Sequence, residues 1–423
     1  MADRILMVAY HFPPCGEVSG TLRTLSMVRG LRSLGWDPII LAPRLASYMS
    51  LDNTLASPDE FGDRVFRSFA IDARQHLGVG GRYPEWLAQP DRWASWRLSA
   101  VPLGLRLIRR YRPKAIWSTY PIATAHLIAA ALNRRSRLPW IADFRDPMLT
   151  GTDDIGRMTR ASRERLERRV VSKADACVFV TRSAMRAYEE RYGVVDHGLF
   201  EVIPNGFDED VVGARLARDR LGYLGATRRV GPLRLLHSGA LYANGRSPEP
   251  LFRALAALRQ RGEISSANLH VVLRGSGPEA VRASYVAMLE HYGIADLVEL
   301  VPAFERSAAL REQLSADGLL LLQGSQFNVQ IPAKVYEYLA IGKPIFALTD
   351  PAGETARLLE SGEGGTVADI GDAAQTEKRL LEFIREVEAG SFVPLAGGEL
   401  QRHVRSAGAA SLVQLLNRVV REP

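Results

Sequence analysis

The sequence predicts an α/β protein of two doubly wound domains in series. The 423 residues exceed the ~100 to 200 of an average domain and fit two cores. A hydrophobic content of 47% and a charged content of 24% lie near the globular average, which excludes a disordered or fibrous chain. Short apolar runs alternate with helical patterns along both halves, which is typical of a parallel sheet covered by helices.

The first half begins with an apolar run at residues 5–9. A helix follows, for which Ser19 is the expected cap, and apolar residues recur at helical spacing as far as Gly35. Further strands, most of them separated by helical patterns, are predicted at 38–42, 65–69, 115–119, 140–143, 176–181 and 200–203. The chain is therefore expected to begin with a buried strand that is followed by an amphipathic helix.

The pattern loosens after Asn205-Gly206, through the charged, glycine-dotted residues 215–232. We place the domain boundary there, between residues 1–212 and residues 213–400. Strands of the second half are predicted at 234–238, 269–274, 298–302, 318–323 and 344–348. Residues 401–423 are expected to form an amphipathic helix docked on a neighbouring surface. Ligands of open α/β sheets bind at the carboxyl ends of strands, so the motifs are expected in a cleft between the domains.

The net charge of +7 is concentrated in the first half. Residues 64–137 hold 14 basic and 3 acidic side chains, interleaved with Tyr83, Trp86, Trp93 and Trp96. A solvated face and an interfacial patch that meets anionic lipid are both open interpretations. A nucleic-acid surface ranks last, because no zinc-finger spacing or RNP-type strand accompanies the charge.

The sequence encodes no recognisable membrane span, secretory signal or metal site. Its longest apolar stretches, such as 122–132, fall short of the ~20 residues that a spanning helix needs, and the cytoplasm is the expected location. Cys15 and Cys177 have no Cys-x-x-Cys companion. The acidic run 208–210 imitates an Asp-x-Asp metal motif, but we interpret it as the start of a helix.

The loop at residues 10–20 leads from the first strand into a helix. Its Gly16 and Gly20 can let backbone N–H groups approach an anion at the helix start, which predicts a phosphate contact. The spacing differs from the dinucleotide-binding fingerprint, so a hydride-transfer enzyme is disfavoured. A plain strand-to-helix turn is the alternative interpretation.

Two loops of the second half repeat this arrangement after strands. Gly239 follows one strand, and Arg246 precedes a helix, where an arginine can clamp a diphosphate or can simply be solvated. Gly275 follows the next strand. In the most specific segment, residues 328–345, Lys334 and Glu337 lie three apart on one helical face, so they can bind a phosphate and vicinal ribose hydroxyls or form a simple ion pair.

With these motifs in order, the chain resembles the glycosyltransferases of family 4, which are retaining nucleotide-sugar enzymes of GT-B fold. The segments that carry the resemblance are 10–23, 143–147, 203–208, 239–246 and 331–344. It implies two Rossmann-like domains facing a cleft, with a C-terminal helix crossing back to the first. The first domain is expected to bind the acceptor and the second the nucleotide-sugar donor, with neither a metal nor another cofactor.

The resemblance also implies roles for single residues. Glu337 matches the glutamate that holds the ribose, and Arg246 matches the basic residue at the diphosphate. Val329 departs from the pattern, because many members carry a second glutamate eight residues before the ribose glutamate. The full set of expected donor-binding residues is Gly16, Gly20, Gly239, Arg246, Gly275, Gln330, Ile331, Lys334 and Glu337.

The catalytic candidates lie in the first half. His11 is the candidate base, whereas His126, within an apolar helix, is interpreted as a packed histidine. Asp143 and Arg145 stand where many relatives place a histidine on the acceptor side.

The expected function is retaining transfer of a sugar to a hydroxyl of a lipid-linked or saccharide acceptor, in the assembly of cell-surface polysaccharide or glycolipid. Cationic and N–H donors can stabilise the departing diphosphate without a metal. The resemblance implies a same-face displacement with no protein nucleophile. The alternatives are a sugar-nucleotide epimerase of the same fold and a non-catalytic nucleotide-sugar-binding scaffold.

Overall fold

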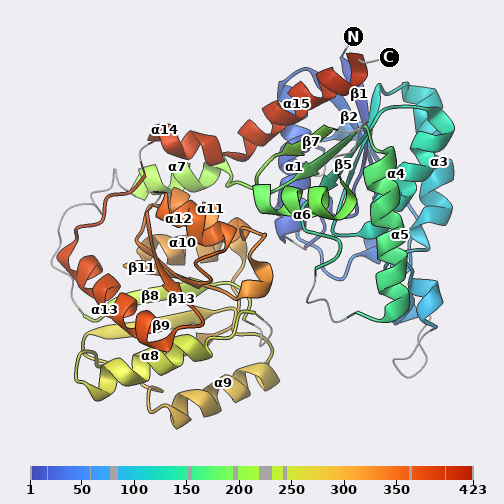
Figure 1. The fold of residues 1–423 in the computed structure, drawn as a ribbon. Coiled ribbons are helices and arrows are strands. Elements are labelled where there is room, and N and C mark those ends of the chain that lie inside the picture. The colour runs from blue at the N-terminus through green and yellow to red at the C-terminus, as the bar shows by residue number, and fades with distance from the viewer. Residues whose placement is uncertain are drawn as a thin grey trace. The chain divides into compact units, whose positions relative to one another are not determined.

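The computed structural model describes residues 2–16, 18–57, 59–76, 84–150, 155–193, 199–218, 231–241, 245–361, 364–395 and 397–421. The chain divides into two compact units (Figure 1). The first contains Met1–Asn205 and Arg405–Pro423, and the second contains Gly206–Val404. Each unit is a parallel sheet with helices on both faces, which confirms the predicted α/β class and its two doubly wound domains.

The first unit contains a seven-stranded sheet of order β3-β2-β1-β4-β5-β6-β7, in which every neighbouring pair is parallel. Along the chain its strands are β1 (Asp3–Val8), β2 (Trp36–Pro43), β3 (Val65–Ser68), β4 (Ala115–Thr119), β5 (Trp140–Phe144), β6 (Ala176–Phe179) and β7 (Leu199–Val202). The strand order reverses between β1 and β4, which is the point where open sheets of this kind bind ligands.

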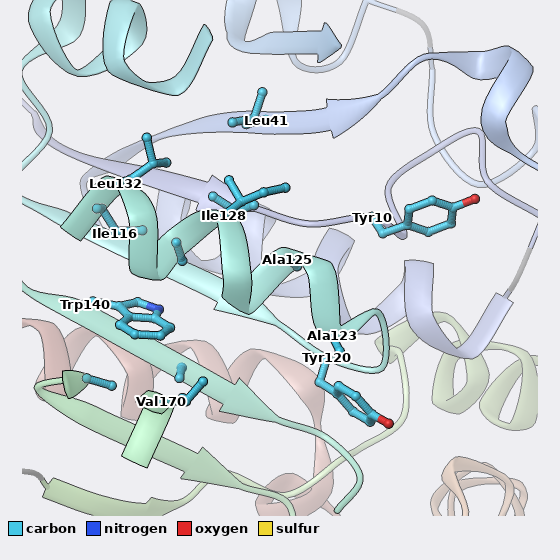
Figure 2. Close-up of a cluster of buried hydrophobic side chains, with 14 of the residues drawn as sticks. Tyr10, Leu41, Ile116, Tyr120, Ala123, Ala125, Ile128, Leu132, Trp140 and Val170 are labelled. Atoms are coloured by element: carbon cyan, nitrogen blue, oxygen red, sulfur yellow. The ribbon is translucent and has the colours of Figure 1, made fainter. Parts of the chain in front are cut away.

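Helices cover both faces of this sheet. They are α1 (Val18–Ser33), α2 (Ala73–His76), α3 (Trp96–Tyr111), α4 (Ala123–Ser136), α5 (Arg157–Lys173), α6 (Arg182–Tyr192) and α15 (Arg405–Arg421). Residues of α3 to α6 join the apolar cluster on one face, and residues of α1 and α15 join the cluster on the other. Figure 2 shows part of the first cluster, with Ile128, Leu132 and Trp140 gathered between α4 and the strands.

Alternation along β5 assigns its side chains to these two clusters. Trp140, Ala142 and Phe144 belong to the cluster that contains α4, and Ile141 belongs to the cluster that contains α1 and α15. Successive side chains of a strand point to opposite faces. Asp143 and Arg145 therefore continue the face of Ile141.

The second unit contains a six-stranded parallel sheet of order β10-β9-β8-β11-β12-β13. Its strands are β8 (Leu233–Ser238), β9 (Leu269–Arg274), β10 (Val298–Val301), β11 (Gly318–Gln323), β12 (Ile345–Thr349) and β13 (Gly365–Asp369). Its helices are α7 (Glu209–Arg218), α8 (Glu249–Gln260), α9 (Glu279–His291), α10 (Arg306–Ser315), α11 (Ala333–Ile341), α12 (Glu354–Glu360), α13 (Ala373–Ala389) and α14 (Gly397–Leu400). Residues of α8, α9 and α13 pack on one face, and residues of α7, α11 and α12 pack on the other.

The predicted strands are all present, each within two residues of its expected ends, and β13 is the strand that the sequence prediction missed. Ser19 lies inside α1 rather than before it. The compact units divide after Asn205, whereas the boundary expected after residue 212 falls inside α7. The helix α7 packs on α11 of the second unit through Val211, so the division precedes it.

The C-terminal helix α15 belongs to the first unit, as the fold prediction expected. A Cβ built on Gly30 of α1 would lie 2.2 Å from Ala409 Cβ, so the two helices approach each other closely. Leu412, Leu415 and Leu416 are buried in the same cluster. Among the described residues, no helix has the length and apolar character needed to cross a bilayer.

Candidate functional site

Near the carboxyl end of its sheet, the second unit gathers three of the expected donor-binding side chains and one residue that was not expected there, His237. His237 lies in β8, Lys334 and Glu337 lie on α11, and Arg246 lies in the turn before α8. Burial, with smaller contributions from the charges of Arg246 and Lys334, lowers the pKa of His237 to about 4. Both cations are therefore within electrostatic reach of the His237 ring, and the four side chains share one region of one unit.

Lys334 and Glu337 form an ion pair on the first turns of α11. Lys334 Nζ donates to Glu337 Oε2 at 2.7 Å, and the two side chains are 31% and 15% exposed. Pro332 is the residue that immediately precedes the first turn of α11. The pair is the simple alternative that the spacing left open, and its partial exposure leaves both charges accessible to a ligand.

The turn that carries Arg246 is fixed to the loop between β11 and α11. Gly245 O accepts from Gly324 N at 2.7 Å, and Gly245 has a φ of +88°. The Arg246 guanidinium lies 5.9 Å from the centre of the Phe327 ring. A loop that is distant in the sequence thus holds Arg246 beside the segment that leads into α11.

Gly239 and Gly275 approach each other after β8 and β9. Gly239 N donates to Arg274 O at 3.0 Å, and Gly275 N donates to Val301 O at 2.9 Å. Neither N–H is available to a phosphate in this conformation. Gly275 has a φ of +90°, and a Cβ there would lie 2.6 Å from Gly239 O, so backbone packing requires a glycine.

Gln330 and Ile331 shape the backbone before α11. Gln323 Nε2 donates to Gln330 O at 3.1 Å, and Thr355 Oγ1 donates to Gln323 Oε1 at 2.7 Å. The Ile331 side chain is buried in the apolar cluster of the second unit. The sequence prediction missed His237 and Gln323, because polar residues inside apolar strands carry no spacing signal, and it missed Thr355 of α12, because its contact with Gln323 depends on tertiary structure.

The first loop of the first unit is stabilised by its own contacts. Gly16 N donates to Ser50 O at 2.9 Å, so this N–H is not available to a phosphate in this conformation. A Cβ on Gly20 would lie 2.7 Å from the ring of His11, which is buried and packs edge-on against Tyr10. The glycine at position 20 lets α1 approach His11.

Asp143 lies in a buried ion pair with Arg23 of α1. Arg23 Nη2 donates to Asp143 Oδ1 at 2.8 Å, and both Arg23 Nε and Thr119 Oγ1 donate to Oδ2, at 3.2 and 2.8 Å. Arg23 also donates to the carbonyls of Ile203 and Pro204. Both oxygens of Asp143 are engaged within the unit, which gives this residue a structural role.

Arg145, the next candidate on the same face of β5, is 7% exposed. Among the described residues, its side chain makes no hydrogen bond or ion pair, and its Nε is buried. Burial lowers the pKa of Arg145, and the neighbouring Asp146 carboxylate opposes that shift. The structure thus separates the two acceptor-side candidates, since Asp143 is fully paired and Arg145 is not.

The interpretation of His126 as a packed histidine is confirmed. The residue is fully buried, and its Nδ1 lies 2.8 Å from Ser118 Oγ, which also accepts from Trp140 Nε1 at 2.8 Å. Burial lowers the pKa of His126 to about 3. Because the His126 ring stays neutral near pH 7 and packs among aromatic residues, we assign it a structural role in the core.

The basic, aromatic stretch 64–137 differs from its expected form. Trp93 and Trp96 are 2% and 0% exposed and belong to the core, so the expectation that they meet lipid is wrong. Both rings pack against Tyr10, and Trp96 Nε1 donates to Ser68 Oγ of β3 at 2.9 Å. Trp86 and Leu98 are 66% and 73% exposed. Tyr83 lies outside the described residues.

The acidic run 208–210 starts α7, as we interpreted it, and both of its aspartates lie near Arg306. The Arg306 Nη2 atom lies 2.8 Å from Asp208 Oδ2 and 3.6 Å from Asp210 Oδ1. In the part of the chain that the structure describes, no group of three or more His, Cys, Asp or Glu residues could hold a metal ion.

Comparison with known proteins bears on the fold of the chain. Residues 20–206 match the family described as glycosyl transferase 4-like domain. No curated protein matches the chain. Among solved structures, the chain is similar to sucrose-phosphate synthase from Thermosynechococcus elongatus, with 15% identity, a TM-score of 0.69 and 99% of each chain covered.

Two further solved structures share the fold over their full lengths. An α,α-trehalose-phosphate synthase (UDP-forming) from Burkholderia vietnamiensis has 14% identity and a TM-score of 0.63, with 100% of each chain covered. HepE from Anabaena in complex with UDP has 14% identity and a TM-score of 0.62, with 98% of this chain and 100% of that chain covered. At this identity the structures establish the shared fold.

Proposed function

We propose that this chain moves a sugar from a nucleoside-diphosphate sugar to a hydroxyl group, with retention at the sugar, because residues 20–206 match the glycosyl transferase 4-like family and the whole chain shares the fold of GT-B glycosyltransferases. The acceptor we propose is a lipid-linked molecule or a saccharide, in the assembly of cell-surface polysaccharide or glycolipid. The observation that carries the proposal is the grouping of Arg246, Lys334, Glu337 and His237 in the second unit. HepE, which has the same fold, was solved with UDP-glucose.

The chemistry of the leaving group accounts for these residue types. A nucleoside diphosphate departs as an anion, and fixed cations at its oxygens lower the barrier to departure. Arg246 and Lys334 are the cations that we assign to the diphosphate, and Glu337 the carboxylate that accepts from the ribose hydroxyls. The departing phosphate itself takes the acceptor proton in this proposal, so no protein nucleophile and no metal ion is needed.

Nucleotide binding provides the direct test. UDP-, GDP-, ADP- and dTDP-sugars are compared by thermal shift, since a ligand that binds only the folded state raises its melting temperature. Glu337→Ala is expected to weaken binding of the selected nucleotide sugar by about 1.5 to 3 kcal/mol, because charged hydrogen bonds are lost. Glu290→Ala is the matched control, since Glu290 is an exposed glutamate of α9 in the same unit.

The outcomes separate the alternatives. Unchanged calorimetric affinity in Glu337→Ala removes this residue from the site. Conversion of the donor without any acceptor identifies an epimerase. Normal nucleotide binding without transfer to any acceptor identifies a scaffold, which Val329 at the position of the family's first glutamate would favour.

We propose that the protein works in the cytoplasm, peripherally at the inner membrane face. The support is α3, where Leu98 is 73% exposed and the neighbouring Arg97, Arg106 and Arg109 are exposed. An apolar side chain among arginines can enter the headgroup region while the charges meet anionic lipid. Phe69, also exposed, accepts from Ser99 Oγ of α3 through its carbonyl.

Sedimentation with anionic vesicles at low salt measures this association. Leu98→Glu combined with Arg106→Gln and Arg109→Gln is expected to reduce the bound fraction severalfold. The charge-matched control replaces Arg165, Arg168 and Arg169 of α5 by Gln, because all three are exposed in the same unit. An equal loss of vesicle binding in the α3 variant and the α5 control contradicts the membrane assignment. So does the absence of vesicle binding by the unaltered protein.

A further inference from the structure

Arg145 follows β5 on the face that α1 and α15 cover. Ile141 of the same strand is buried among residues of those two helices, and Asp143 pairs with Arg23 of α1. Arg145 continues this alternation by two residues, which takes it to the carboxyl end of the strand. This is the edge of the sheet where ligands of open α/β folds bind.

The charges around Arg145 leave an excess of positive charge. The side chains that act electrostatically on it are Asp146, Arg23, Asp143 and Arg405, the first residue of α15. Three arginines thus face two aspartates. Asp143 is fully occupied by Arg23 and Thr119. The Asp146 carboxylate makes no ion pair with Arg145 within the described residues.

A buried guanidinium normally has a charged or hydrogen-bonding partner, since removing a charge from water without one is costly. Arg23 illustrates the usual solution, with its N–H groups directed at one carboxylate and at backbone carbonyls. Arg145 has a similar burial and the same type of group, but none of these contacts among the described residues. The difference indicates that an anion from outside the chain completes its site.

We propose that Arg145 binds a phosphate group of the acceptor. A guanidinium presents parallel N–H donors that match phosphate oxygens, and Arg405 supplies a second positive charge nearby. The acceptor is assigned because Arg145 lies in the first unit, whereas the cations proposed for the donor diphosphate lie in the second. This assignment rests on the proposed function, and it restricts the acceptor class to phosphorylated molecules, such as a polyprenyl phosphate or a sugar phosphate.

Calorimetric titration of the full chain with inorganic phosphate at low ionic strength tests the site. Arg145→Gln is expected to weaken phosphate binding at least tenfold. Arg145→Lys keeps the charge but loses the paired donors. Its phosphate affinity is expected to lie between that of Arg145→Gln and that of the unaltered protein. Arg168→Gln, which changes an exposed arginine of α5, is the control, and its phosphate affinity is expected to stay within twofold of the unaltered protein. Melting temperatures without phosphate verify that each variant is folded.

A second titration in saturating UDP distinguishes the two sources of phosphate. Phosphate affinity within twofold of its value without UDP supports the acceptor, and competitive displacement by UDP overturns that assignment in favour of the donor diphosphate. Unchanged affinity in Arg145→Gln, equal loss in Arg168→Gln, or no phosphate binding by the unaltered protein overturns the site. If UDP itself fails to bind, the proposed function fails, while the comparison of the arginine variants still decides the anion site.

Discussion

Asp143 and Arg23 form an ion pair whose side chains are 1% and 4% exposed. Asp143→Ala would leave the Arg23 guanidinium buried and uncompensated, so we expect the free energy of unfolding to fall by about 3 to 5 kcal/mol. Urea unfolding measures this change. Glu60→Ala removes the partner of Arg29 in an exposed pair of the same unit and is expected to cost less than about 1 kcal/mol. Equal losses in the two variants would contradict the structural role of Asp143.

His126 gives the stability a defined pH dependence. Its pKa is about 3 in the folded protein and returns to about 6.5 on unfolding, so the unfolded chain alone binds a proton between these values. The contribution of neutral His126 to the free energy of unfolding is therefore complete above pH 6.5. It is lost as the pH falls toward 3, by about 1.4 kcal/mol per pH unit. His126→Asn is expected to reduce this slope by that amount, measured by urea unfolding at pH 7, 6 and 5. An unaltered slope would show that another group dominates it.

The candidate site was predictable where residue type and spacing carry the chemistry. Lys334 and Glu337 are three residues apart on a helix, so any helix over this segment brings them together. His237 was missed because it lies within a buried strand, where its approach to Arg246 and Lys334 depends on tertiary structure. The pairing of Asp143 with Arg23 was missed for the same reason, since 120 residues separate the two.

At the scale of elements, α1 and α15 approach each other closely where Gly30 meets Ala409. A Cβ on Gly30 would lie 2.2 Å from Ala409 Cβ, so Gly30→Ala forces the helices apart. We expect a loss of about 1 to 3 kcal/mol in the free energy of unfolding. The double variant Gly30→Ala with Ala409→Gly is expected to recover most of it. Gly213→Ala in α7, where nothing lies within 4 Å, is expected to be neutral or stabilising.

Buried parallel strands are the elements that the sequence predicted best. Their apolar runs, such as residues 318–323, are bounded by helical patterns and turn residues. The missed strand β13 has the sequence Gly-Thr-Val-Ala-Asp and pairs only with β12. An edge strand buries fewer side chains and needs no continuous apolar run, so the pattern gave no signal there. The start of α1 was misplaced because serine is a favourable residue type at a helix N-cap, but residue type alone does not fix where the helix begins.

At the scale of the whole molecule, the first unit is built from two separate segments of the chain. Residues 405–423 return after the entire second unit and complete the apolar cluster that covers one face of the first sheet. The second unit contains its own two apolar clusters, formed entirely by residues 206–404. The two units therefore depend differently on the C-terminal helix, although both are parallel sheets of similar size.

Removal of residues 405–423 is expected to destabilise the first unit selectively. The deletion uncovers the partners of Leu412, Leu415 and Leu416, and burying each such side chain contributes about 1.5 to 3 kcal/mol. Hydrogen exchange read by peptide mass spectrometry is expected to show lost protection in β1, β4 and β5 and retained protection in β8, β9 and β11. Leu415→Ala and Leu416→Ala in the full chain should shift protection in the same direction by a smaller amount. Equal loss of protection in both sheets would mean that the units unfold as one, and that the helix stabilises the molecule as a whole.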